Sequence, residues 1–297
     1  MGIVDSHHHL WDPAGANYPL LSGPMHDRGW GDWGPLRRPY LVADFLSDAR
    51  SQDLVKSVHV QANRDPADPV AETAWLDQLA RDPQSQGFPH AVVAYANLAA
   101  PDAREVLDGH AGYARVRGIR QVLNRHDDPR FNRAEHDWLS MPQWRDNLGL
   151  LVARGWSFDA QLYFPQMPAL ADLARRYPDL RIVIDHAGTP VDRDPAGLEG
   201  WRRGMRLLAS CPNVSVKLSG YGMTDPTWTI DSLRPFVLEP IDWFGPDRAM
   251  FGSNFPVDRL MSGYARLWDA YRTIVAEFSE PERHALMKGT AERFYRI

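Results

Sequence analysis

Short apolar, β-branched segments alternate with amphipathic segments along nearly the whole chain, and this alternation constrains the fold more than any other feature. It is typical of α/β proteins built from βα units, in which parallel strands form one sheet and helices cover it. We count eight apolar segments, the number of strands in a closed (β/α)8 TIM barrel. The predicted strands cover residues 2–7, 55–61, 90–97, 116–122, 157–162, 181–185, 214–218 and 249–253.

Each predicted strand is followed by a segment with the apolar period of an amphipathic helix. Several of these segments begin with proline, whose missing N–H costs no hydrogen bond in the first turn. The predicted helices cover residues 42–52, 70–81, 101–107, 142–154, 167–177, 198–210, 230–244 and 264–278, with a short last helix over 280–288. We therefore predict a single barrel domain over residues 1–297. Two long loops, 11–41 after the first strand and 124–141 after the fourth, are predicted to be functional.

The composition argues against several classes of protein. With 33 Lys and Arg against 38 Asp and Glu, the net charge is −5, and the arginine pairs are scattered, which argues against a nucleic-acid-binding surface. The single cysteine, Cys211, cannot form an internal disulfide, so we expect a reducing, cytoplasmic location. No apolar run approaches the ~18 residues of a membrane span. The expected partner is a small-molecule substrate, and the sequence leaves open whether the chain forms a homo-oligomer.

Polar side chains gather where the predicted strands end. In a (β/α)8 barrel the active site is built at that edge, from strand ends and the loops that follow them. The candidate site residues are therefore the polar residues at the ends of the eight predicted strands: His7 and His9, Gln61, Asn97, Arg120, Gln161, His186, Lys217 and Asn254.

Three of these residues are histidines. His7 and His9 are two residues apart, so in an extended strand both side chains point to one face, whereas His8 points to the other. Together with His186 they supply three neutral nitrogen ligands for one zinc-like divalent metal, and a fourth position stays open for water. The alternative is a set of hydrogen-bonded core histidines. The barrel context favours the catalytic interpretation, so we predict that the three imidazoles converge.

Two cationic residues and two glutamines at the strand ends are predicted to contact substrate. Lys217 lies within an apolar strand, where an ammonium group needs a partner or a polar cavity. We interpret it as an anion or oxyanion binder, the alternative being a pair with a structural carboxylate such as Asp185. Arg120 either holds a substrate carboxylate in bidentate fashion or forms a salt bridge. Gln61 and Gln161 complete the predicted substrate contacts.

The first long loop is rich in glycine and tryptophan. Residues 29–34 satisfy the pattern G-x-G-x-x-G, but no strand leads into it and Pro35 follows it, so we predict no nucleotide cofactor. Trp11, Trp30 and Trp33 indicate an aromatic rim suited to a sugar-like or planar substrate. Core packing is the alternative for each of them.

With these residues the chain resembles the amidohydrolase superfamily, and specifically the amidohydrolase-2 group of sugar-lactone and 2-pyrone-4,6-dicarboxylate lactonases. The resemblance is nearly full length and rests on the segments IVDSHHHLWDP, LRRPYLVADF, VRGIRQVLN, RIVIDHAGTP, NVSVKLSG, DRAMFGSNFPVD and GTAERFYRI. It implies a (β/α)8 barrel whose site is lined by His7, His9 and His186. Relatives with two metals take a bridging Lys or acid from strand four and a His from strand five. This chain has Arg120 and Gln161 there, so we expect one divalent metal or none.

The main departure from the family is on strand eight. The family usually has an Asp there, in GSDWP, as the general base, whereas this chain has Asn254 in GSNFP. An asparagine accepts no proton near neutral pH. Asp258 follows four residues later, about 13 Å further along an extended chain, so it replaces the base only if the loop folds back. We favour Asp258 as the base over a site in which Asn254 is a degraded family base.

These features lead us to expect a hydrolase that uses activated water to open a lactone or related cyclic ester of a small sugar-acid or carboxylated substrate. Two alternatives stay open: a metal-dependent decarboxylase of the same superfamily, and a non-catalytic small-molecule-binding barrel. Release of carbon dioxide rather than addition of water would identify the first. The missing base permits the second, and the histidine pair disfavours it.

Overall fold

The structure is a computed structural model that describes residues 1–25, 27, 29 and 31–297. Eight strands form one sheet in the order of the sequence, and each neighbouring pair is parallel. They are β1 (Ile3–His8), β2 (Leu54–Val60), β3 (Ala91–Tyr95), β4 (Val116–Val122), β5 (Ser157–Gln161), β6 (Ile182–Ile184), β7 (Val214–Leu218) and β8 (Ala249–Phe251). All eight predicted strands are confirmed, and their ends agree within two residues.

The sheet closes into a barrel between β1 and the residues that follow β8. His8 pairs with Phe255 in a parallel bridge. The N–H of Asn254 donates to the carbonyl of His7 at 2.7 Å, and the N–H of His9 donates to the carbonyl of Phe255 at 2.7 Å. These bonds fix Asn254 beside the histidines of the first strand.

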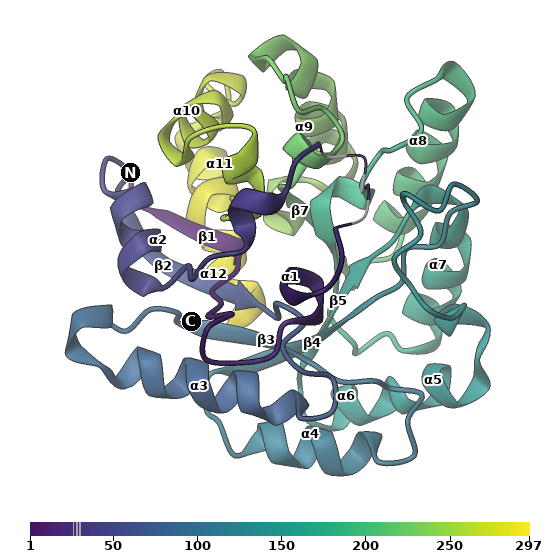
Figure 1. Ribbon diagram of the computed structural model, residues 1–297. Coiled ribbons are helices and arrows are strands. Elements are labelled where there is room, and N and C mark those ends of the chain that lie inside the picture. Colours follow the sequence, from purple (N-terminus) through teal and green to yellow (C-terminus); the bar gives the residue numbers. More distant parts are fainter. Residues whose placement is uncertain (26, 28, 30) are drawn as a thin grey trace.

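Helices connect the strands and surround them (Figure 1). Aspartates cap two of them: the Asp68 side chain accepts the N–H of Ala71 at the start of α3, and the Asp194 side chain caps α8 in the same way. The helices are α1 (Pro19–Ser22), α2 (Val42–Ala49), α3 (Pro69–Arg81), α4 (Ala103–Ala111), α5 (Pro142–Asn147), α6 (Gly149–Ala153), α7 (Met167–Arg176), α8 (Pro195–Ala209), α9 (Ile230–Phe244), α10 (Tyr264–Ile274), α11 (Glu280–His284) and α12 (Thr290–Tyr295).

Helix α1 forms within the predicted loop 11–41, the ends of α2, α4, α8 and α10 differ from the prediction by three or four residues, and two segments differ more. The single helix expected over 142–154 is divided at Leu148 into α5 and α6. The last helix does not end at 288, because a π-helical turn leads from α11 into α12. Helix α12 packs Phe294 and Tyr295 against apolar residues inside the barrel, among them Val4 and Met250. The barrel is thereby closed with apolar side chains at the end where its strands begin.

The long loop after β1 crosses the opposite end of the barrel, with α1 in front of the strands (Figure 1). Its two ends are held together because Trp11 and Tyr40 exchange backbone hydrogen bonds of 3.0 and 2.9 Å. The predicted aromatic rim is only partly present. Trp11 lines a cavity, Trp33 is 2% exposed and packs in the core, and Trp30 lies outside the described residues.

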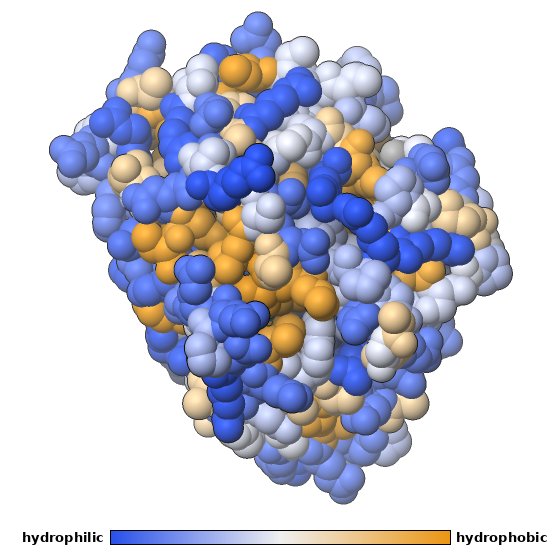
Figure 2. Space-filling model, turned by 60° about the vertical axis from the view of Figure 1, so that its left-hand side comes forward, coloured by the Kyte–Doolittle hydropathy of each residue, from blue (hydrophilic) through white to orange (hydrophobic). Residues whose placement is uncertain are grey.

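The surface is mostly hydrophilic on the face that Figure 2 shows, and a central band of hydrophobic residues interrupts it. In the part of the chain that the structure describes, none of the helices has the length and apolar character needed to span a membrane.

Candidate active site

A cavity of about 410 Å³ opens at the end of the barrel where the strands end. Its walls come from the strand ends and from the two long loops, as predicted for the active-site end of a (β/α)8 barrel. Six residues predicted from the sequence line it: His9, Trp11, Arg120, Gln161, His186 and Asn254. Five other predicted residues do not line it: His7, Gln61, Asn97, Lys217 and Asp258.

The three predicted histidines lie side by side. The ring centroid of His7 is 5.1 Å from that of His9 and 4.4 Å from that of His186. His9 Nδ1 donates to the carbonyl of Val60 at 2.6 Å, so its Nε2 is left free for the cavity. His186 Nδ1 is bonded to Ser219 Oγ at 2.9 Å. Among the described residues the buried Nε2 of His7 has no hydrogen-bond partner.

Burial keeps these imidazoles neutral. It lowers the pKa of His7 and of His9 well below the ordinary histidine value, and it lowers the pKa of His186 to about 3. The Arg120 guanidinium lowers the pKa of His9 and His186 further, whereas Asp185 partly opposes the lowering at His186. Neutral imidazoles can accept a proton or bind a metal, so the three side chains are in the form that either role requires.

His186 stands on an unusual backbone segment. From His186 to Thr189 all four residues have positive φ, at 55°, 49°, 72° and 44°. Non-glycine residues rarely adopt this conformation, and its cost is met where surrounding contacts fix it. Trp201 Nε1 donates to the carbonyl of Ala187 at 2.7 Å. Gly220 lets the next loop approach, because a Cβ at this position would lie 2.4 Å from His186 Nδ1.

Lys217 lies below the cavity in a buried ionic cluster. Its Nζ is 2.6 Å from Asp159 Oδ2, 3.3 Å from Asp185 Oδ1 and 3.4 Å from His7 Nδ1, and its side chain is 0% exposed. Tyr295 donates to Asp159 at 2.7 Å. Although burial alone would raise it, Lys217 and His7 hold the pKa of Asp185 well below its ordinary value. The alternative interpretation, a Lys paired with buried carboxylates, therefore describes Lys217 better than contact with substrate.

Arg120 reaches the cavity from β4. Its Nη1 donates to Gln161 Oε1 at 3.0 Å, its Nη2 donates to the carbonyl of Gln61 at 2.5 Å, and Asp185 Oδ2 lies 3.7 Å away. Gln61 thus holds Arg120 through its backbone, while its side-chain Oε1 accepts the N–H of Asn63 at 2.7 Å. Arg120 and Gln161 are in place to contact a ligand, and Gln61 supports them.

The segment after β8 folds back, which settles where Asp258 lies. A 3-10 turn over Val257–Leu260 replaces the extended course considered above. As a result Asn254 Nδ2 donates to Asp258 Oδ1 at 3.0 Å, and the Asp258 N–H donates to the Asn254 carbonyl at 3.1 Å. Asp258 is fully buried directly behind Asn254, and its Oδ2 has no hydrogen-bond partner among the described residues. Burial raises the pKa of Asp258 to about 7, against smaller opposing effects of Asn254 and the Gly222 backbone.

Several cavity residues were not predicted from the sequence. Arg133, in the loop after β4, and Met223, after β7, both line the cavity. Pro19 and Leu20 of α1 cover it from the first loop. The long loops themselves were recognised, but nothing in their composition indicates which side chain turns inward.

The metal prediction has a mixed outcome. In the described residues no group of three or more His, Cys, Asp and Glu side chains is arranged to hold a metal ion. The Nδ1 edge of His7 faces Asp185 and Lys217, and its Nε2 has no hydrogen-bond partner among the described residues. Their donor chemistry still fits a single divalent ion, because a partner engages each Nδ1 and leaves each Nε2 free, as in many metal-binding histidines.

Comparison with known proteins gives matches along the whole chain. A sequence profile described as Amidohydrolase matches residues 4–297. The uncharacterized protein y4mH of Sinorhizobium fredii is 45% identical over 298 residues, which is 100% of this chain and 99% of that protein. An L-fucono-1,5-lactonase of Burkholderia multivorans is 32% identical over 99% of this chain and 96% of its own. The crystal structure of an amidohydrolase from Burkholderia multivorans with bound zinc is 29% identical and superposes over 100% of both chains with a TM-score of 0.82.

Proposed function

Because this chain belongs to the amidohydrolase family, in the group that contains the L-fucono-1,5-lactonases, we propose that it opens a lactone or related cyclic ester of a small carboxylated substrate. Water is the nucleophile, and the cavity at the strand ends is the site. The observation that carries the proposal is the placement of His9, His186 and Asn254 in this cavity, with the Asn254 amide bonded to the buried carboxyl of Asp258. These are the parts that water addition to an ester needs.

The charge of the cavity favours an anionic substrate. Arg120 and Arg133 line it, and none of its described lining residues is an Asp or Glu. A carboxylate on the substrate can therefore pair with a guanidinium at the cavity wall, and the carboxylate near Arg120, that of Asp185 at 3.7 Å, does not line the cavity. The Gln161 side chain accepts a hydrogen bond from Arg120 and thereby helps to orient its guanidinium group.

Asn254 and Asp258 act as a pair in this proposal. Asn254 lines the cavity, and its Nδ2 is held by Asp258, so its Oδ1 is left to accept a hydrogen bond from the attacking water. Asp258 takes the proton of that water through one intervening water, a separation at which a general base still acts. A carboxyl with a pKa of about 7 is a far better base at neutral pH than an ordinary Asp. Arg120 stabilises the negative charge that develops on the carbonyl oxygen.

A single divalent ion, when bound, would be held by the Nε2 atoms of His7, His9 and His186 and would lower the pKa of a bound water. The residues themselves fix the orientation of these nitrogens. Val60 and Ser219 hold the rings of His9 and His186 through their Nδ1 atoms.

The test is a comparison of two lactones, with proton release as the readout. We expect purified protein to hydrolyse 2-pyrone-4,6-dicarboxylate in preference to the uncharged L-fucono-1,5-lactone. Arg133→Gln should raise KM for the dicarboxylate at least tenfold and leave the uncharged lactone unaffected, because one charged hydrogen bond is worth about 1.5–3 kcal/mol. His186→Asn is the control for contaminating esterases. Equal loss on both lactones would refute the charge argument, and no turnover of either would refute the substrate class.

A further inference from the structure

A second cavity of about 300 Å³ lies on the other side of Trp11. Trp11 lines both cavities, and its ring stacks on His9 with centroids 6.2 Å apart. The segment after β8 also borders both. Its residues Asn254 and Val257 face the catalytic cavity, whereas Pro256, Arg259 and Leu260 face the second one. The second cavity is thus separate from the catalytic one but shares two walls with it.

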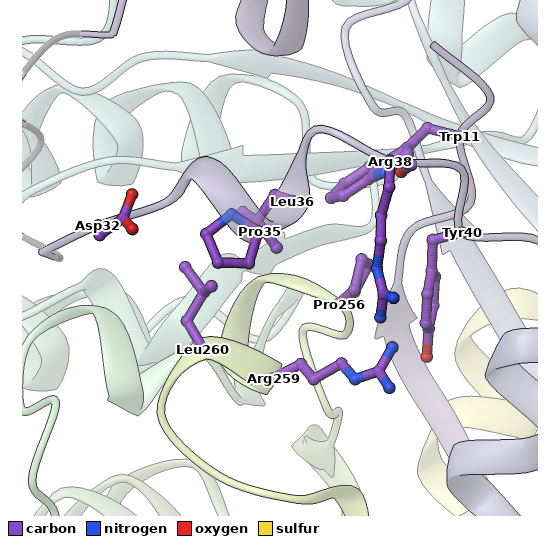
Figure 3. Close-up of a pocket in the computed structure, with 9 residues that line it drawn as sticks. All are labelled: Trp11, Asp32, Pro35, Leu36, Arg38, Tyr40, Pro256, Arg259 and Leu260. Atoms are coloured by element: carbon purple, nitrogen blue, oxygen red, sulfur yellow. The ribbon is translucent and has the colours of Figure 1, made fainter. Parts of the chain in front are cut away.

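Two guanidinium groups meet in this cavity. Figure 3 shows the side chains of Arg38 and Arg259 pointing toward each other beside Tyr40. Arg259 has one acidic neighbour, since its Nε is 3.6 Å from Asp48 Oδ2, and that same oxygen accepts the Tyr40 hydroxyl at 2.8 Å. In the part of the chain that the structure describes, the Arg38 guanidinium has no ion-pair partner. Two guanidinium groups with a single carboxylate, that of Asp48 beside Arg259, leave a net positive charge at this end of the cavity.

The walls around the guanidinium pair are flat and apolar. Trp11 and Tyr40 are 3% and 2% exposed and form rigid aromatic sides, and Leu36, Pro35 and Leu260 complete the lining. Asp32, the acid of this lining, lies at the opposite side of the cavity from the arginines in Figure 3. Its Oδ1 accepts the N–H of Gly34 at 2.8 Å, which keeps it there. A ligand therefore meets positive charge at one end of the cavity and apolar surface between the ends.

We propose that this second cavity binds a small organic carboxylate with a flat apolar body. The carboxylate lies between Arg38 and Arg259, whose planar forks match its two oxygens. The apolar body packs between Trp11, Leu36 and Leu260. This binding site is independent of the hydrolysis proposed above, and its test uses no turnover.

The probe is benzoate, and binding is measured by isothermal titration calorimetry on the full chain. We expect benzoate to bind and benzamide, which has the same shape without the charge, to bind at least tenfold more weakly. Arg38→Gln and Arg259→Gln should each weaken benzoate binding about tenfold or more, in line with the loss of charged hydrogen bonds. Arg38 is exposed, so its variant removes charge without disturbing the core.

Two control variants separate this site from general charge and from the catalytic cavity. Arg104→Gln removes an exposed charge from α4 and should leave benzoate binding unchanged. Arg133→Gln removes charge from the catalytic cavity and should also leave it unchanged. Loss of binding in Arg133→Gln together with full binding in Arg38→Gln would place benzoate in the catalytic cavity and overturn the proposal. Equal binding of benzoate and benzamide, or no binding of benzoate, would overturn it as well.

Discussion

Replacing Asp258 by Asn tests the proposed base without changing its shape. The asparagine Oδ1 can still accept from Asn254 Nδ2 at the present 3.0 Å, so the fold of the segment is kept. The variant removes only the ability to ionise. We expect turnover at pH 8 to fall by a factor of about 100 or more, the usual contribution of a general base, with little change in substrate affinity. The rise of wild-type turnover through about pH 7 should disappear in the variant.

The same substitution has a calculable effect on stability. The pKa of Asp258 is about 7 in the fold, against 3.8 for the ordinary side chain. Because the folded value is the higher one, the stability linked to this group is complete below about pH 4 and is lost as pH rises through about 7. At 1.36 kcal/mol per pKa unit, the fold loses about 4 kcal/mol of stability between about pH 4 and pH 7, where only the unfolded chain ionises this carboxyl.

Urea unfolding at pH 5 and pH 8 measures this term. Asp258→Asn should exceed the wild-type stability by about 2 kcal/mol at pH 5, where the unfolded carboxyl is already ionised, and by up to about 4 kcal/mol at pH 8, while turnover is lost. If Asp258 only supported the fold, Asp258→Asn would lower the stability at both pH values and leave turnover unchanged. That result, or turnover within threefold of the wild type, would refute the assignment of Asp258 as base.

Three further substitutions, two of them paired with a comparison variant, test how the site is built. His8→Phe should lower kcat/KM less than tenfold, because the His8 ring faces away from the cavity, whereas His9→Asn should lower it at least 100-fold in the same steady-state assay. Lys217→Met should destabilise the protein by about 3–5 kcal/mol in urea unfolding, because two buried carboxylates lose their cation, and a loss below 1 kcal/mol would contradict the cluster. Gly220→Ala should destabilise the protein and lower turnover, because its Cβ would collide with the His186 imidazole. Gly155→Ala, at a similar φ of 61° and with the nearest atom 3.5 Å from its Cβ, should cost only the backbone strain.

The fold could be predicted from the sequence because every βα unit repeats the same pattern, a short apolar segment followed by an amphipathic segment. The eight strands are marked by short β-branched runs, and the ends of the barrel follow from their parallel order. The last helix was missed beyond residue 288 because α12 is set by tertiary contact. Its Phe294 and Tyr295 are buried against strands far away in the sequence, and a local pattern does not show such contacts.

The sequence predicted which residues form the site better than it predicted how deep each side chain lies in the barrel. Strand alternation predicted the direction of the His9 side chain, and polarity at a strand end predicted that Arg120 lies at the cavity. Parity does not give height along the barrel axis, so Lys217 was expected in the cavity and lies beneath it. Asp258 depends on a 3-10 turn, and Arg133 depends on the path of a long loop. Neither conformation has a periodic signature in the sequence.

Product analysis in ¹⁸O-labelled water tests the central claim most directly. Incubation with 2-pyrone-4,6-dicarboxylate should give a product heavier by one water, with the label in a carboxylate and no carbon dioxide released. Unlabelled product with release of carbon dioxide would instead make the chain a decarboxylase. In that case the imidazoles, Arg120 and the buried Asp258 would need a different chemical account.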